Sequence, residues 1–186
     1  MKFTMEKVLD GAVAAFDAHG VGVSTAKVAS IAGVSNGTLF NYFRTKQELV
    51  DAIYLYLKGQ LAEAIGEIDA QRPLIEQSRQ IYTAWFGWAA AAPERSRVAA
   101  LLHQSGLVSD AAVAKMLEAF AAPARVLTDL EASGTMVDLP TDYVSALMQA
   151  QVELAVASNL NEQQRQTAFD AMWNSIAPGT TAGESP

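Results

Sequence analysis

The chain contains no cysteine, which excludes disulfides and thiolate metal sites and favours a reducing, cytoplasmic compartment. Long apolar runs are also missing, since no uninterrupted stretch approaches the length of a membrane-spanning helix. Only two histidines are present, far apart, and the motifs HExxH, GxSxG and a glycine-rich phosphate loop do not occur. We therefore expect a soluble protein that is not an enzyme, with no cofactor, no metal site and no membrane partner.

Positive charge is scarce, because the net charge is −7. Taken alone, this value argues against a protein that binds nucleic acid. The distribution is uneven, however. Residues 1–50 hold five bases against four acids, whereas residues 51–186 hold eight bases against sixteen acids. Such asymmetry suggests that the two parts of the chain have different tasks.

The length of the chain, 186 residues, suits one ordinary domain or a small domain fused to a larger one. The opening stretch, MKFTMEKVLDGAVAAF, has two acidic residues in its apolar region and lacks a small-residue cleavage site, so we do not expect a secretion signal. The last stretch, PGTTAGESP at residues 178–186, is small and polar enough to be disordered.

Nearly every segment has helical periodicity and no stretch alternates like a strand, so the predicted fold is all-α. Residues typical of helix ends punctuate the first fifty positions: a stop at His19-Gly20, a cap at Ser24 or Thr25, a stop at Gly33, a cap at Ser35 and a capping box at Thr45–Glu48. The last of these opens a long fourth helix. Further helices are predicted at residues 74–91, 94–105, 109–132, 141–159 and 161–177.

Two short helices joined by Gly33-Val34 give residues 24–43 the layout of a helix-turn-helix, in which the second helix faces base edges in a major groove of DNA. The first turn of that second helix has unpaired N–H groups and a positive dipole end, which suit a phosphate. Gly37 lets the backbone approach DNA closely, and short polar groups suited to base edges lie at Asn36, Thr38 and Asn41.

The string AGVSNGTLFNYF at residues 32–43, followed by Lys46 and Leu49, resembles the signature of the TetR family of bacterial transcriptional regulators. This resemblance covers about the first 50 to 58 residues. It implies a helix-turn-helix DNA-binding domain at residues 1–45 and a helical effector-binding and dimerisation domain at residues 46–177. It also implies a cytoplasmic homodimeric repressor that a largely apolar small-molecule effector releases from a pseudo-palindromic DNA operator.

The resemblance assigns DNA-binding roles to single residues. The phosphate-contacting tyrosine and lysine of the family fall on Tyr42 and Lys46, and the cap of the second helix falls on Ser24 or Thr25. The cap and the base-facing positions of the recognition helix fall on Ser35, Asn36, Gly37, Thr38 and Asn41. Two departures stand out: Phe40 occupies a position that is often tyrosine, and the interval from Gly20 to Val28 is one residue short.

Aromatic and other large side chains in the second part of the chain are candidates for an effector pocket, which in proteins is mostly apolar with a few polar groups. The candidates are Tyr82, Trp85, Phe86, Trp88, Leu102, His103, Met116, Phe120 and Met148. The same residues at helical spacing are also typical of a hydrophobic core, so both interpretations remain open.

The helix predicted at 141–159 is apolar on two faces, one carrying Tyr143, Leu147, Ala150 and Leu154. We expect one face to need a partner, and the predicted dimer interface consists of Val144, Met148, Val152, Ala155, Phe169, Met172, Trp173 and Ile176. A helix buried wholly within its own domain would show the same two stripes.

A second class of function fits the weak positive charge of residues 1–50. The chain could be a helical ligand-binding or interaction protein whose DNA-reading surface has decayed. Binding to a defined DNA site that weakens as salt rises separates the two classes, because a decayed reader would show neither site preference nor strong retention.

Overall fold

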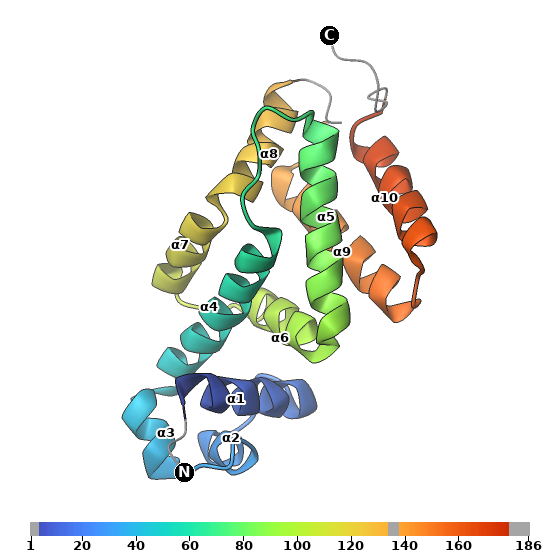
Figure 1. The fold of residues 1–186 in the computed structure, drawn as a ribbon. Coiled ribbons are helices and arrows are strands. Elements are labelled where there is room, and N and C mark those ends of the chain that lie inside the picture. Colours follow the sequence, from blue (N-terminus) through green and yellow to red (C-terminus); the bar gives the residue numbers. More distant parts are fainter. Residues whose placement is uncertain (1–3, 134–137, 179–186) are drawn as a thin grey trace. The chain divides into compact units, whose positions relative to one another are not determined.

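The computed structural model describes residues 4–133 and 138–178, and its regular secondary structure within these ranges is helical (Figure 1). The helices are α1 (Met5–His19), α2 (Thr25–Ile31), α3 (Asn36–Tyr42), α4 (Lys46–Ile65), α5 (Leu74–Ala91), α6 (Pro93–Gln104), α7 (Asp110–Ala119), α8 (Ala121–Ala132), α9 (Thr141–Ala157) and α10 (Glu162–Ile176). The predicted all-α fold is confirmed. Disorder is predicted for residues 178–186, and of these, residues 179–186 lie outside the described ranges.

The helices group into two compact units. Unit 1 comprises residues up to Gln60 together with Ala92–Ala119, and unit 2 comprises Leu61–Ala91 together with the chain from Phe120. Helix α4 therefore starts in one unit and ends in the other. This grouping by compactness differs from the functional division at residue 45, which stays a prediction, because α6 and α7 belong to the same unit as the first three helices.

Within unit 1, α1 packs against α2 and α6, and α2 packs against α3. The core of this unit includes fully buried side chains of α1 and α4, such as Phe16, Ile53 and Leu57. Two ion pairs join α6 to α1: Arg95 Nη2 lies 3.2 Å from Asp10 Oδ1, and Arg97 Nη2 lies 2.8 Å from Asp17 Oδ2. Helix α6 is thus fastened to α1 by packing and by charge.

The long helix α4 begins with half of the predicted capping box. The hydroxyl of Thr45 accepts a hydrogen bond from the N–H of Glu48 at 3.0 Å, as predicted. The Glu48 carboxylate, however, accepts from the N–H of Arg44 at 2.7 Å and not from that of Thr45. The side chain therefore ties the helix start to the preceding turn.

The prediction of a single helix at 109–132 is wrong, because the helix is interrupted at Phe120 and divides into α7 and α8. Pro123 provides the physical reason: it has no N–H to donate to the carbonyl of residue 119, so a continuous helix would lose that hydrogen bond and place the proline ring against the carbonyl. The proline instead lies in the first turn of α8, where a missing N–H costs little.

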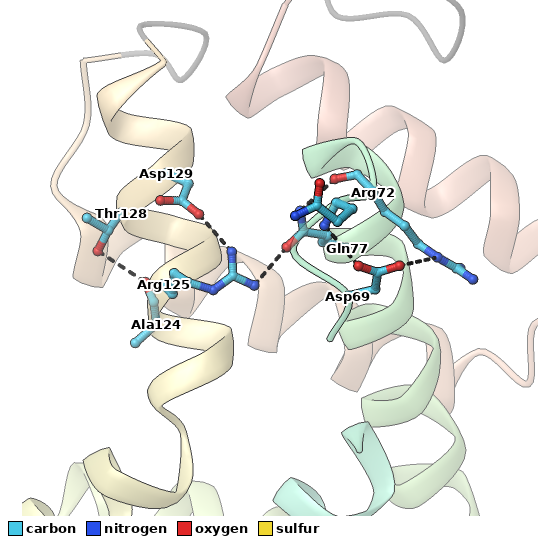
Figure 2. A network of polar contacts seen from close by, with 8 residues as sticks. Asp69, Arg72, Gln77, Ala124, Arg125, Thr128 and Asp129 are labelled. Atoms are coloured by element: carbon cyan, nitrogen blue, oxygen red, sulfur yellow. Dashed lines mark hydrogen bonds and ion pairs between the residues drawn. The ribbon is translucent and has the colours of Figure 1, made fainter. Parts of the chain in front are cut away.

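Within unit 2, α5 contacts α8, α9 and α10, and Figure 1 shows it among these three helices. A polar network fixes the start of α5 (Figure 2). The buried side chain of Gln77 donates to the carbonyl of Arg72 at 2.6 Å and accepts from Arg125 of α8 at 3.0 Å. Arg125 also pairs with Asp129 at 2.8 Å. The amide nitrogen is therefore engaged by the turn before α5, and the amide oxygen by α8.

The eight residues predicted to form the dimer interface lie in the core of unit 2. Each of them is at least nine-tenths buried by the chain itself, namely Val144, Met148, Val152, Ala155, Phe169, Met172, Trp173 and Ile176. Burial inside one chain makes these side chains inaccessible to a second copy. The neighbouring apolar stripe of α9 is the more exposed one, with 55% of Tyr143 and 62% of Leu154 accessible to solvent, although Leu147 in this stripe is partly buried.

Candidate functional site

Helix α3 has a polar outer face, and its inner face is anchored in the core. Ser35 caps it, accepting from the N–H of Thr38 at 3.0 Å, and the hydroxyls of Ser35 and Thr38 lie 2.9 Å apart. Leu39 is buried and holds the inner face. Of the side chains predicted to face bases, those of Asn36 and Asn41 are exposed and that of Thr38 is partly exposed.

The turn before α3 has the geometry that a glycine makes possible. Gly33 has φ of +70°, and the chain around it closes α2 with two hydrogen bonds, from Gly33 N–H to the Ser30 carbonyl at 3.2 Å and from Val34 N–H to the Ala29 carbonyl at 3.0 Å. This is a Schellman motif, in which a left-handed residue after the helix pairs the last carbonyls. It turns the chain sharply from α2 into α3.

The cap of α2 is Ser24. Its hydroxyl accepts from the N–H of Lys27 at 3.2 Å, and Thr25 is the first residue of the helix. The choice between the two residues, open in the sequence, is settled by backbone conformation, because Ser24 has the extended φ and ψ of an N-cap.

The residues predicted to contact phosphates lie just after this surface. Tyr42 is half-buried at the end of α3, its ring centroid 6.2 Å from that of Phe43. Lys46 is exposed, and its Nζ donates to the carbonyl of Val21 at 2.8 Å. Phe40 is 41% exposed, so a large apolar ring stands at the surface where a tyrosine is common in the family.

A cavity of about 270 Å³ lies between α5 and α10 in unit 2. Its lining residues are Arg79, Tyr82, Thr83, Phe86, Gly87, Glu162, Arg165, Gln166 and Phe169. Two predicted pocket residues, Tyr82 and Phe86, belong to it. The two arginines were missed by sequence reasoning, although Arg79 precedes Tyr82 by three positions and so lies on the same helix face.

The other candidates for the pocket lie elsewhere. Trp85, Trp88 and Phe120 are partly buried and pack against the core of unit 2, and Met148 lies inside that core. Three more belong to unit 1, namely Leu102, His103 and Met116.

His103 has a structural environment of its own. Its Nδ1 lies 3.2 Å from the hydroxyl of Tyr54, and the two rings are stacked with centroids 6.2 Å apart. Burial, with the nearby charge of Lys58, lowers the pKa of this imidazole. The stacking and the hydrogen bond place this ring against α4 within unit 1.

Comparison with known proteins agrees with this geometry. The family described as bacterial regulatory proteins, tetR family, matches residues 8–53, which span α1 to α3 and the start of α4. A solved transcription regulator assigned to this family, from Shewanella sp. PV-4, is 26% identical with a TM-score of 0.79, covering 95% of this chain and 99% of that one. Residues 8–53 belong to the TetR family.

Two further structures share the fold of this TetR-family chain. A TetR family transcription regulator from Marinobacter aquaeolei VT8 is 22% identical with a TM-score of 0.81, covering 92% of this chain and 94% of that one. The transcriptional regulator FadR from Bacillus subtilis, in complex with stearoyl-CoA, is 18% identical with a TM-score of 0.71, covering 96% of this chain and 100% of that one.

This TetR-family domain makes the protein a DNA-binding transcriptional regulator and not an enzyme. Within the described ranges, none of the helices combines the length and apolar character needed to cross a membrane. The same ranges bring together no cluster of three or more histidine, aspartate or glutamate side chains suited to a metal ion.

Proposed function

We propose that this TetR-family regulator is a homodimeric repressor that leaves its operator when a small-molecule effector binds. The observation that carries the DNA-binding part is the anchored, polar surface of α3, where Leu39 is buried while Asn36 and Asn41 are exposed. A rigid helix that shows short polar groups suits the reading of base edges.

The proposed contacts fall into two groups. Asn36, Gly37, Thr38 and Asn41 face bases. Tyr42 and Lys46 contact phosphates, and the backbone near the caps of α2 and α3 contacts them too, at Ser24, Thr25 and Ser35. Phosphate contacts position the helix on the duplex, whereas base contacts select the sequence.

The proposed dimer forms through the exposed stripe of α9, with Tyr143, Leu147, Ala150 and Leu154 against the same stripe of a second copy. A large, apolar and accessible helix face favours a partner in solution. A second copy fits the DNA-binding part as well, because a dimer doubles the phosphate contacts and reads two half-sites of a pseudo-palindrome.

The proposed effector acts through the connection between α5 and α6. These helices follow one another in the chain, and α6 is ion-paired to α1. An effector that moves α5 thereby pulls on α6 and on the helix-turn-helix. To change the ratio of released to DNA-binding arrangement from 1:99 to 99:1, the effector must bind the released arrangement more favourably by about 5.5 kcal/mol. That the structurally similar FadR binds stearoyl-CoA supports an effector in principle.

The test starts with selection of a binding site from random duplex DNA, followed by fluorescence anisotropy over a series of salt concentrations. We expect a pseudo-palindromic consensus and an affinity that falls steeply with salt. The variant Gly37→Ala sharpens the test, because its new Cβ would lie 3.8 Å from the Ser35 hydroxyl, an ordinary contact that the fold accepts. It should reduce operator binding, while the midpoint of thermal unfolding stays the same or rises because alanine has the better helix propensity.

Recovery of no consensus would favour the alternative, a helical ligand-binding protein that no longer reads DNA. Effector coupling has its own check, because linkage is reciprocal. Operator DNA must weaken effector binding by the same factor by which the effector weakens operator binding. Equal effector affinities in the free protein and in the operator complex would end the sensor part of the proposal.

A further inference from the structure

Two of the residues that line the cavity between α5 and α10 carry a buried polar atom with no partner among the described residues, the hydroxyl of Tyr82 and Nη1 of Arg79. Tyr82 is only 2% exposed. A buried polar atom without a partner costs free energy, so such atoms in a native protein call for an explanation. Both atoms are hydrogen-bond donors, since burial raises the pKa of Tyr82 and keeps its hydroxyl protonated.

Arg79 is held in a fixed orientation. Its Nη2 donates to Asp170 of α10 at 3.1 Å, and its guanidinium carbon lies 4.4 Å from the ring centroid of Phe169. One edge of the guanidinium is therefore engaged by a carboxylate, and the plane rests on an aromatic face. Nη1, on the same guanidinium, has no hydrogen-bond partner among the described residues.

Arg165 adds a second positive charge. Its guanidinium carbon lies 4.4 Å from the ring centroid of Phe86, and its Nη1 donates to the carbonyl of Leu160 at 3.3 Å. It forms no ion pair with any carboxylate in the described part of the chain. Its charge acts on Tyr82, because it opposes the rise in the pKa of that hydroxyl. Glu162 is the only acid among the nine lining residues.

We propose that this cavity binds a small organic anion, whose carboxylate accepts hydrogen bonds from the Tyr82 hydroxyl and Arg79 Nη1 near the charge of Arg165. The apolar body of the ligand lies in the cavity between α5 and α10, beside Phe86. That this anion is the effector rests on the proposed release of the operator. The binding site itself is inferred from the contacts above and does not depend on that release.

The volume limits the size of the anion. A cavity of about 270 Å³ corresponds to about nine waters at their share of liquid volume, and lies just below the range of pockets for drug-sized ligands. A short aromatic or aliphatic monocarboxylate fits this space. Benzoate and hexanoate are therefore the probes, and benzamide and hexanamide are the neutral controls of the same shape.

The first experiment is calorimetric titration of the full chain with each acid and its amide. A carboxylate that receives charge-assisted hydrogen bonds should bind at least about tenfold more tightly than the amide. If neither acid binds more tightly than its amide, the proposal is overturned.

Variants then test the contacts. Tyr82→Phe removes a hydroxyl that has no protein partner, so the midpoint of thermal unfolding should stay the same or rise while benzoate affinity falls about tenfold. Arg165→Gln should weaken benzoate and leave benzamide unaffected. Arg72→Gln is the matched control, because Arg72 lies in the same unit but does not line the cavity. Unchanged benzoate affinity in both cavity variants would overturn the site.

Operator release is measured separately by anisotropy, so that the two proposals can fail independently. If benzoate binds through Tyr82 but does not release the operator, the binding site is supported and its regulatory role is ruled out. If an effector releases the operator equally well from the wild type and from Arg165→Gln, the regulatory proposal is supported but the effector site lies elsewhere.

Discussion

At the scale of single residues, Lys46 has a hydrogen bond within the protein and still has donors available for a DNA phosphate. Its ammonium group has three donors, of which one is engaged by the Val21 carbonyl at 2.8 Å. The replacement Lys46→Ala should weaken binding about equally on all DNA sequences and reduce the magnitude of the salt slope by roughly one unit per half-site. Anisotropy over a salt series measures both effects.

A suitable control is Lys115→Ala, since Lys115 is also exposed but lies on α7. This variant should leave the salt slope unaltered. A Lys46→Ala variant with changed sequence preference and an unchanged salt slope would contradict the assignment to phosphate.

Asn41 is expected to report base sequence. It is exposed on the same helix as Thr38, three positions apart, but the Thr38 hydroxyl already lies 2.9 Å from that of Ser35. Replacement of either residue by alanine should cost about 1–3 kcal/mol at one base position per half-site. Site selection with each variant reveals the relaxed position. An unchanged consensus for both variants would rule out their reading role.

Asp17 makes a contribution to stability that depends on pH. Its hydrogen bonds with Arg97, at 2.9 and 2.8 Å, hold the pKa of its carboxyl below the usual value of 3.8. The unfolded state then binds more protons around that pH, so the contribution is complete above the unfolded pKa and is lost as the pH falls through the folded pKa. Because the Arg97 side chain is 60% exposed, the effect should be below about 1 kcal/mol.

The variant Arg97→Gln should therefore flatten the dependence of the unfolding free energy on pH between about pH 5 and 2. Urea titrations at a series of pH values provide the measurement. Arg72→Gln is the comparison, since its pair with Asp69 is longer, at 3.9 Å, and should affect this slope little. An unaltered slope in Arg97→Gln would show that the pair contributes nothing.

At the scale of helices, the packing of α1 on α2 depends on a close approach at Gly11. A Cβ added there would lie 2.6 Å from the Cβ of Ala32 and closer still to its Cα. Gly11→Ala should therefore destabilise the fold by about 1–3 kcal/mol despite the better helix propensity of alanine. Thermal unfolding with operator binding as a second reading would detect the displaced α2.

Gly59 provides the matched control on α4, because a Cβ there meets nothing within 4 Å. Gly59→Ala should raise stability by about 0.5–1 kcal/mol through helix propensity alone. If both variants changed stability in the same direction, steric contact with Ala32 would not be the cause.

At the scale of the whole molecule, the proposed dimer requires the exposed stripe of α9. Leu154→Glu introduces a charge into that contact and should convert the dimer to a monomer, because a buried unpaired carboxylate is costly. Sedimentation velocity measures the oligomeric state, and operator affinity should fall as the second half-site is lost. Leu117→Glu on α7 is the control, since Leu117 is also exposed, at 54%. A dimeric Leu154→Glu variant would rule out this interface.

Several features of the molecule followed from local patterns in the sequence. The end of α1 at Gly20, the turn at Gly33 and the caps of α2 and α3 depend on the backbone preferences of a few adjacent residues. Such preferences act over one helical turn, so reading neighbours is enough. The same reading missed the break at Phe120, because the apolar period continues across it and only the missing N–H of Pro123 opposes a continuous helix.

Which face of α9 is core was decided by tertiary structure alone. Both stripes are apolar and have the same period, so the sequence by itself determined a helix with two such faces and nothing about which one the chain covers. Packing of α5 and α10 against α9 buries Val144 and Val152 and leaves Leu154 exposed. The cavity has the same origin. Arg79 and Arg165 are distant in sequence, and only the packing of α5 against α10 brings their charges to one site, because helical periodicity contains no information on contacts between distant helices.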